Sequence, residues 1–255
     1  MSVKKLTTQN YRNLASATID FHPDLNFILG DNGSGKSSIL EAIFYLGHGK
    51  SFRNAKLENL VTFDKDSFVV SLENNNADRF GIKRDVAHGL SDIKINGDKV
   101  SRLSELAINI AVQVITPESF KLFFGGPKER RKFFDLGMFH VKHQFGKYWR
   151  DFVKLQKHRN ALLKNYAKKT DFEFWNHQFV EQSELISELR NDYFVQLSKE
   201  LGNWISILLP ELVEEIKVQY YQGWPSKKSL VDVLNANFDK DCQLGFTQYG
   251  AHKFD

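Results

Sequence analysis

One stretch, Gly30-Asp31-Asn32-Gly33-Ser34-Gly35-Lys36-Ser37, limits what this chain can fold into more than any other. It fits the pattern G-x-x-x-x-G-K-[ST], which is the phosphate-binding loop (P-loop) of nucleoside triphosphatases. Glycines let successive backbone N–H groups point inward and form a concave anion site. The pattern assigns Lys36 to the β- and γ-phosphates and the hydroxyl of Ser37 to Mg²⁺. The sequence therefore predicts a nucleotide site.

The segments on either side of this loop have the character that a P-loop requires. Residues 25–29 form a short apolar run of the strand type. Residues 38–46 carry apolar side chains at positions 39, 40, 43 and 46, which predicts a helix with one buried face, and Gly47 is predicted to stop it. A glycine-rich turn can match the motif by chance, but the predicted strand and helix around it argue against that interpretation.

Composition excludes several classes of protein. The only cysteine among the 255 residues is Cys242, which excludes an internal disulfide framework and a cysteine-based zinc site and indicates a reducing, cytoplasmic environment. No apolar run of about 18 residues is present, so no membrane partner is expected. The net charge of +4 favours an anionic partner mildly, and an ordinary solvated surface explains it equally well.

The region around the P-loop is predicted to be rich in β-structure. Residues 3–8 and 17–21 read as a first strand pair, joined by a turn that carries Arg12. Residues 55–100 read as short strands with a hairpin at Asn96-Gly97. Residues 69–73 superficially resemble a Walker B strand, but we reject this interpretation because a glutamate stands where the Mg²⁺-binding aspartate belongs.

Together these features resemble a known family. The Asn10-Tyr11-Arg12-Asn13 turn followed by the P-loop is similar to the ABC-type ATPase heads of the SMC, Rad50 and RecF group. Gly49-Lys50-Ser51-Phe52-Arg53, Pro117-Glu118 and the block from Gly125 to Asp135 narrow the resemblance to the RecF family of DNA replication and repair proteins. The similarity covers essentially all of the chain.

The resemblance implies an α/β fold class: a P-loop NTPase of ABC-ATPase-head type with a flanking antiparallel β-sheet, plus a helical second lobe with long antiparallel helices. The expected domains are an ATP-binding lobe over 1–125, a helical lobe over 126–235, and over 236–255 the start of a C-terminal part. One departure is Phe123, which stands where the family usually has an aliphatic residue.

The resemblance also implies site residues. Arg12 and Asn13 should approach the phosphates, and the Q-loop residue that senses Mg²⁺ or water is either Gln113 or Glu118. Residues 111–116 read as a strand, at whose carboxyl end a polar residue commonly faces ligand, although an ordinary strand-edge glutamine explains Gln113 equally well. The predicted metal ligands are Ser37 and Gln113. The predicted ATP-binding residues are Gly30, Asp31, Asn32, Gly33, Ser34, Gly35, Lys36, Ser37, Ser38, Arg12 and Asn13.

The second half of the chain has helical periodicity. Apolar stripes over 144–167 and 171–209 predict two long antiparallel helices, the second ending at Pro210. Arg130 and Arg131 fall in a charge cluster at a helix start. We favour a structural or interdomain role for them over contact with DNA phosphate.

The end of the chain shapes the expected activity. Residues 216–221 and 243–249 read as strands, and no Walker B or signature motif follows them, so we expect an N-terminal fragment. For the full-length parent the resemblance implies ATP-driven dimerisation, binding of double-stranded DNA and single-strand/double-strand junctions, and slow ATP hydrolysis with Mg²⁺. It also implies gap repair with the partners RecR and RecO, within the SOS response.

Two alternatives stay open from the residues alone. One is a small-molecule kinase without a DNA role. The other is a module that binds nucleotide without hydrolysing it. The β-rich region and the long helices argue against the kinase, because a kinase of this size would place its lid and acceptor site there.

Overall fold

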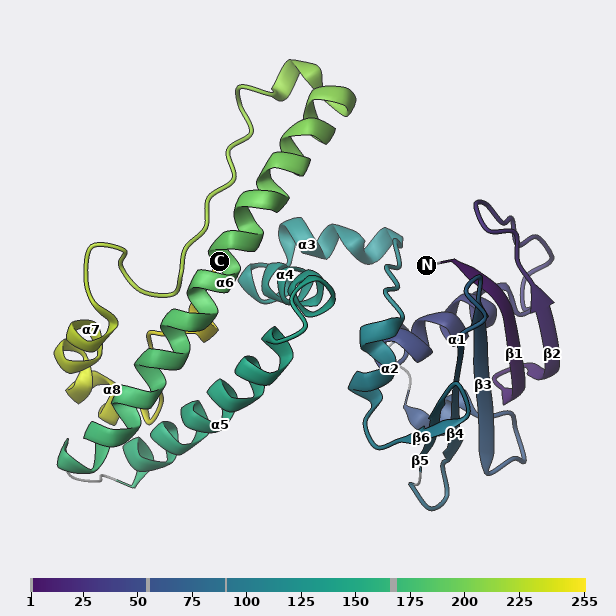
Figure 1. Cartoon of the computed structure of the whole chain (residues 1–255), viewed down its shortest axis with the longest axis horizontal. Coiled ribbons are helices and arrows are strands. Elements are labelled where there is room, and N and C mark those ends of the chain that lie inside the picture. The colour runs from purple at the N-terminus through teal and green to yellow at the C-terminus, as the bar shows by residue number, and fades with distance from the viewer. Residues whose placement is uncertain (1, 54–55, 90, 166–168) are drawn as a thin grey trace. The chain divides into compact units, whose positions relative to one another are not determined.

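The computed structural model describes residues 2–53, 56–89, 91–165 and 169–255. The chain divides into two compact units, Met1–Pro117 and Glu118–Asp255 (Figure 1). The first unit contains the P-loop and the second is helical. The predicted α/β character with a separate helical part is therefore present.

The first unit is built on a six-stranded antiparallel sheet of order β2-β1-β3-β4-β5-β6. Every second residue of the third strand is buried, as a sheet with one covered face requires. This alternation confirms the predicted β-rich region. The strands are β1 (Val3–Tyr11), β2 (Leu14–Asp20), β3 (Ser67–Asn74), β4 (Arg79–Asp85), β5 (Ser91–Ile95) and β6 (Asp98–Val100).

Two tight hairpins shape this sheet. Strands β5 and β6 are joined by Asn96 and Gly97, whose φ angles of 51° and 93° are those that a two-residue hairpin favours. Strands β1 and β2 are joined by Arg12 and Asn13, and Arg12 has a φ of 56°. The first hairpin was predicted from its Asn-Gly pair. The second places the predicted Arg12 turn at one end of the sheet.

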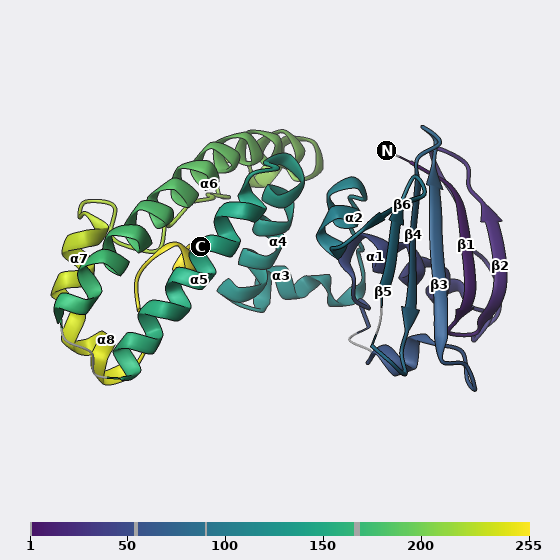
Figure 2. The same ribbon diagram turned by 60° about the horizontal axis from the view of Figure 1, so that its bottom comes forward.

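Helices α1 (Lys36–His48) and α2 (Leu103–Asn109) pack against one face of the sheet (Figure 2). The buried face of α1 differs from the prediction, since Ala42, Tyr45 and Leu46 are buried whereas Leu40 is exposed. The predicted helix stop at Gly47 was also wrong. Gly49, with a φ of 66°, ends the helix. Gly47 lies inside it, where a Cβ would come within 2.8 Å of the Ile110 carbonyl oxygen.

Two predicted strands of this unit do not form. Residues 25–29 and 111–116 have no regular structure, and no described segment pairs with either of them. A strand exists only with a hydrogen-bonded neighbour, so strand-type side chains are insufficient. In the first segment, the Asn26 side chain accepts from the His22 N–H and donates to the His22 carbonyl, which favours a local turn over a strand.

The second unit is a helical assembly whose two longest helices are antiparallel neighbours (Figure 1). Their direction follows because Phe145 at the start of α5 contacts Arg190, whereas Arg159, later in α5, contacts Asn176 near the start of α6. This confirms the predicted pair. The predicted stripe over 144–167 ends in α5 at Lys164, and residues 166–168 lie outside the described residues. The helices are α3 (Lys121–Phe124), α4 (Pro127–Val141), α5 (Phe145–Lys164), α6 (Glu173–Leu208), α7 (Leu230–Ala236) and α8 (Phe238–Leu244).

Three details of this unit differ from the prediction. The last turns of α6 are not buried, since Trp204 and Leu208 are exposed. Residues 216–221 form no strand: the Ile216 N–H donates to Leu212 in a turn, and among the described residues Tyr221 pairs with the single residue Asp255 rather than with a neighbouring strand. Residues 243–249 are not a strand either, since α8 runs to Leu244 and Gly245 caps it in the left-handed conformation.

The last residues of the chain are held by arginines of α4. Arg130 forms a bidentate ion pair with Asp255, and Arg131 donates to the Phe254 carbonyl. Both arginines thus bind within the helical unit, and their contacts are structural.

Candidate nucleotide-binding site

The P-loop and the hairpin beside it enclose a pocket of about 630 Å³, which is within the range of small-molecule sites. Most of the predicted ATP-binding residues line it. Several residues that were not predicted to bind ATP line it as well. The full lining is Arg12, Asn13, Asn32, Gly33, Ser34, Gly35, Lys36, Ser37, Ser38, Arg53, Asn59, Val61, Thr62 and Phe63.

The glycines of the loop are required by its conformation. Gly33 and Gly35 have φ angles of 84° and 98°, in the region where side chains are strained. A Cβ at Gly35 would also lie 2.9 Å from the Leu14 side chain, and one at Gly30 would lie 2.8 Å from the Ser34 hydroxyl oxygen. Glycine at these positions is what a phosphate cradle requires, because its backbone must adopt such conformations and approach the ligand closely.

Lys36 and Ser37 stand at the start of α1. The Lys36 ammonium donates to the carbonyl oxygens of Gly30 and Asp31, each at 2.7 Å, so its charge lies over the loop. The positive end of the α1 dipole points in the same direction. Loop, lysine and helix end together favour a phosphate, and the Ser37 side chain lines the same pocket.

Asn13 fastens the hairpin to the P-loop. Its side-chain amide donates to the Gly33 carbonyl at 2.8 Å, and its side-chain oxygen accepts from the Ser38 hydroxyl at 2.8 Å. Asn13, one of the predicted ATP-binding residues, also lines the pocket. Its two hydrogen bonds additionally hold the loop and the first turn of α1 in one arrangement.

Arg12 forms the wall of the pocket together with a buried carboxylate. Its guanidinium donates to both oxygens of Glu41, at 2.9 and 2.8 Å, and Ser51 donates to the same carboxylate. The hydrogen bonds with Glu41 raise the pKa of Arg12, which stays charged. The Ser51 hydroxyl in turn accepts from the Arg53 backbone N–H. Glu41 was not among the predicted site residues, because the predicted apolar face at 39, 40, 43 and 46 places it on the opposite side of the helix.

The segment from Asn59 to Phe63 forms the rim. It is tied to the hairpin because the Arg12 N–H donates to Leu60 and the Thr62 hydroxyl donates to the Arg12 carbonyl, both at 2.8 Å. Phe63 remains 89% exposed. The rim therefore presents an aromatic face on an anchored segment.

Neither of the two predicted Q-loop residues lines the P-loop pocket. Gln113 does not line the pocket, and its exposed amide donates to the neighbouring Val114 carbonyl. Glu118 belongs to the second unit, where it pairs with Lys121. Among the described residues no cluster of three or more histidine, cysteine, aspartate or glutamate side chains is arranged to hold a metal ion.

Comparison with known proteins decides the family. The sequence family described as RecF/RecN/SMC N terminal domain matches residues 2–199. The DNA replication and repair protein RecF of Colwellia psychrerythraea is 53% identical over all 255 residues, which cover 68% of that protein. This chain belongs to the RecF family. The RecF of Pseudoalteromonas translucida is 41% identical, with all of this chain and 71% of that protein covered.

Solved structures agree with the RecF assignment. A structure described as the recombination mediator protein RecF-ATP in the RecFOR pathway superposes with a TM-score of 0.86 at 26% identity, and covers 100% of this chain and 72% of that one. A second, described as RecF-ATPrS, gives a TM-score of 0.82 at 26% identity and covers 99% of this chain and 72% of that one. The predicted fold class, that of RecF and its ABC-type ATPase relatives, is confirmed, and the family's function is DNA replication and repair. No helix in the described part of the chain has the length and apolar content needed to cross a membrane.

Proposed function

We propose that this chain binds ATP with Mg²⁺ at the P-loop pocket and couples that binding to DNA. The observation that carries the proposal is the assembled cradle: an open glycine loop, Lys36 above it, and a hairpin fastened to it by Asn13. A similar protein is described with ATP. When bound, Mg²⁺ would neutralise phosphate charge, and Ser37 is the residue here that would ligate it.

The rim indicates how the nucleotide would lie. The phosphates would occupy the loop, and the base would leave toward Val61 and Phe63, since an aromatic base needs an apolar neighbour. Arg12 would act through its charge beside the phosphates while Glu41 holds its guanidinium in place. We also propose Gln113 as the Mg²⁺-sensing residue. This role requires residues 111–116 to rearrange when the nucleotide binds, because Gln113 does not line the pocket.

For the full-length protein we propose ATP-dependent dimerisation, binding of double-stranded DNA and of junctions with single strands, and weak DNA-dependent ATP hydrolysis. RecR and RecO are the proposed protein partners in gap repair, in the cytoplasm. The +4 net charge supports an anionic partner without locating its surface. Membership of the RecF family removes the reason to prefer a small-molecule kinase.

The test is duplex binding with and without ATP by the full-length protein and by its Lys36→Ala variant. We expect ATP to strengthen duplex binding of the unmodified protein and to leave the variant unchanged. Affinity should fall steeply with salt and depend little on base sequence. Lys94→Ala is the control, because Lys94 is exposed on β5 and does not line the pocket. Equal duplex affinity with and without ATP would remove the coupling.

A further inference from the structure

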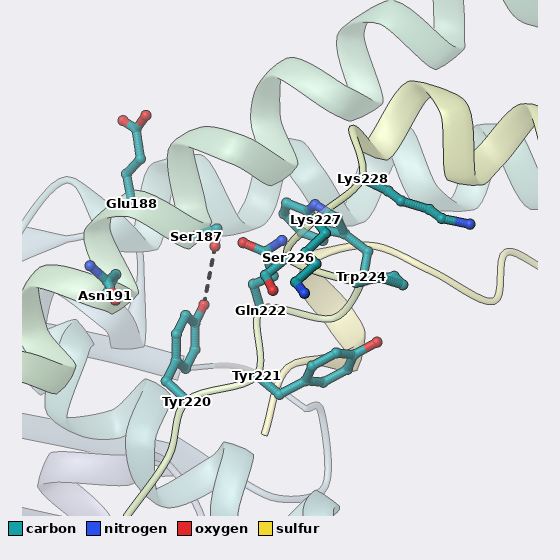
Figure 3. Close-up of a pocket in the computed structure, with 11 residues that line it drawn as sticks. Ser187, Glu188, Asn191, Tyr220, Tyr221, Gln222, Trp224, Ser226, Lys227 and Lys228 are labelled. Atoms are coloured by element: carbon teal, nitrogen blue, oxygen red, sulfur yellow. Dashed lines mark hydrogen bonds between the residues drawn. The ribbon is translucent and has the colours of Figure 1, made fainter.

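The helical unit contains a second pocket that the P-loop chemistry does not use. It measures about 790 Å³ and lies between α6 and the segment that leads to α7 (Figure 3). Ser187, Glu188 and Asn191 come from α6, and the other lining residues come from 220–228. Its volume falls within the range of small-molecule sites, so a ligand larger than water fits.

The walls of this pocket are held in place. The Tyr220 ring packs against Phe134, Phe194 and Phe254 in the core, and its hydroxyl lies 3.4 Å from the Ser187 hydroxyl. The neighbouring residue, Tyr221, has its backbone fixed by two hydrogen bonds with Asp255, of 2.6 and 2.9 Å. The pocket is therefore built before any ligand arrives, which lowers the entropic cost of binding.

Tyr221 offers a free aromatic surface. Its backbone is fixed, but its side chain is 44% exposed, and Figure 3 shows its ring turned away from the Tyr220 ring. Trp224, in contrast, is buried and closes the inner wall. An exposed ring on an anchored segment is a stacking platform, because a planar ligand ring covers it without ordering the protein further.

The charge beside that ring is positive. Lys227 and Lys228 line the pocket, both are exposed, and neither has an ion-pair partner in the described part of the chain. The Lys228 N–H donates to the Pro225 carbonyl, which fixes the turn that carries both lysines. Glu188 is the single carboxylate of the lining. The net preference is for an anion next to a flat ring.

A nucleotide unit combines these two properties, since its base is flat and its phosphate is anionic. We propose that this pocket binds one nucleotide unit of a single strand, with the base on Tyr221 and the phosphate on Lys227 and Lys228. The proposal deepens the proposed function, because it takes DNA as the partner from it and assigns a single-strand contact to the helical unit. It needs neither ATP nor the P-loop.

The experiment measures fluorescence anisotropy of a labelled twelve-nucleotide oligothymidylate at low salt, without ATP, on the full chain. The double variant Lys227→Gln/Lys228→Gln should weaken binding about tenfold or more and lower the salt dependence by roughly the share of one phosphate contact. Tyr221→Ala should weaken it about tenfold, and Tyr221→Phe should restore most of that loss. The matched control is Lys217→Gln/Lys240→Gln, which removes the same charge from exposed positions of the same unit outside the pocket.

Competition with thymidine monophosphate distinguishes a free nucleotide or strand end in the pocket from an internal unit of a strand. Displacement by the monophosphate assigns the pocket to a free nucleotide or strand end, and no displacement assigns it to an internal unit of a strand. Equal losses in the pocket and control variants, or full binding by Tyr221→Ala, would overturn the proposal. An unmodified chain that does not bind the oligonucleotide would overturn it as well. ATP-stimulated duplex binding is measured in a separate experiment. If ATP has no effect there, the single-strand measurements can still be interpreted, because they contain no ATP.

Discussion

Two arginine–carboxylate pairs, one in each unit, use the same chemistry in opposite surroundings. Arg12 pairs with Glu41 at the edge of the P-loop pocket, with 19% of the arginine side chain exposed. Arg190 pairs with Asp135 in the helical unit, where the arginine is fully buried and lies 3.6 Å from the centre of the Phe254 ring. The hydrogen bonds with Glu41 raise the pKa of Arg12, whereas burial lowers the pKa of Arg190.

The difference shows which pair has a role beyond folding. Arg190 is enclosed by Trp149, Phe145 and Phe254, and donates to the Ala251 carbonyl as well as to Asp135, so no ligand can reach it. Arg12 keeps one side open to a pocket that holds a phosphate loop. We therefore assign the Arg190–Asp135 pair to the core of the helical unit and the Arg12–Glu41 pair to the proposed nucleotide site.

Removing Arg190 should produce the largest loss of stability. Arg190→Ala leaves Asp135 and the Ala251 carbonyl without their donor and opens a cavity among aromatic rings, so the free energy of unfolding should fall by about 3–5 kcal/mol. Urea denaturation measures the change. Lys199→Ala, at an exposed position of the same helix, is the control. A loss no larger than that of the control would show that the buried pair contributes nothing.

Removing Glu41 should cost less, because water can reach part of Arg12. Glu41→Ala leaves the guanidinium and the Ser51 hydroxyl without their acceptor, and we expect a loss of about 2–3 kcal/mol. ATP affinity should fall as well, since Arg12 is no longer held. Glu58→Ala, at an exposed position of the same unit, serves as the control. Destabilisation with unchanged ATP affinity would move the Arg12 pair into the same structural class as Arg190.

These two pairs also show what the sequence could and could not reveal. Arg12 was predicted as a site residue because the Asn10-Tyr11-Arg12-Asn13 turn ahead of the P-loop resembles the RecF family. The carboxylate that holds it was missed, since Glu41 reads locally as an ordinary helix residue. Arg190 lies in the long apolar stripe of α6, and its role depends on Phe254 and Ala251, which are far away along the chain.

The local sequence pattern predicted a helix or hairpin correctly where its backbone hydrogen bonds are made within that element. The helices over 145–164 and 173–208 and the Asn96-Gly97 hairpin form as expected because their hydrogen bonds lie within the element or its nearest neighbour. Residues 25–29 and 111–116 have equally good strand character and form none, because a strand depends on a partner that its own sequence does not specify.

The smallest expected effect concerns the rim of the P-loop pocket. Phe63→Ala removes an aromatic face on which the base is proposed to lie, and should weaken ATP binding by about 0.5–1.5 kcal/mol without changing stability. Isothermal titration with ATP and Mg²⁺ measures it. Phe27→Ala removes another exposed ring, outside the pocket, and should have no effect. Equal affinities in the two variants would place the base elsewhere.

The most direct test of the account is the affinity of ATP for the chain with and without the P-loop lysine. Isothermal titration of the unmodified chain, of Lys36→Ala and of the control Lys94→Ala should be made with Mg²⁺ present, after circular dichroism shows that all three are folded. The account predicts that Lys36→Ala loses about 2–3 kcal/mol of binding free energy, roughly a hundredfold, because a charged donor to the phosphates is gone. Lys94→Ala should bind as the unmodified chain does. Identical ATP affinity in all three proteins would contradict the assignment of residues 30–37 as the nucleotide site.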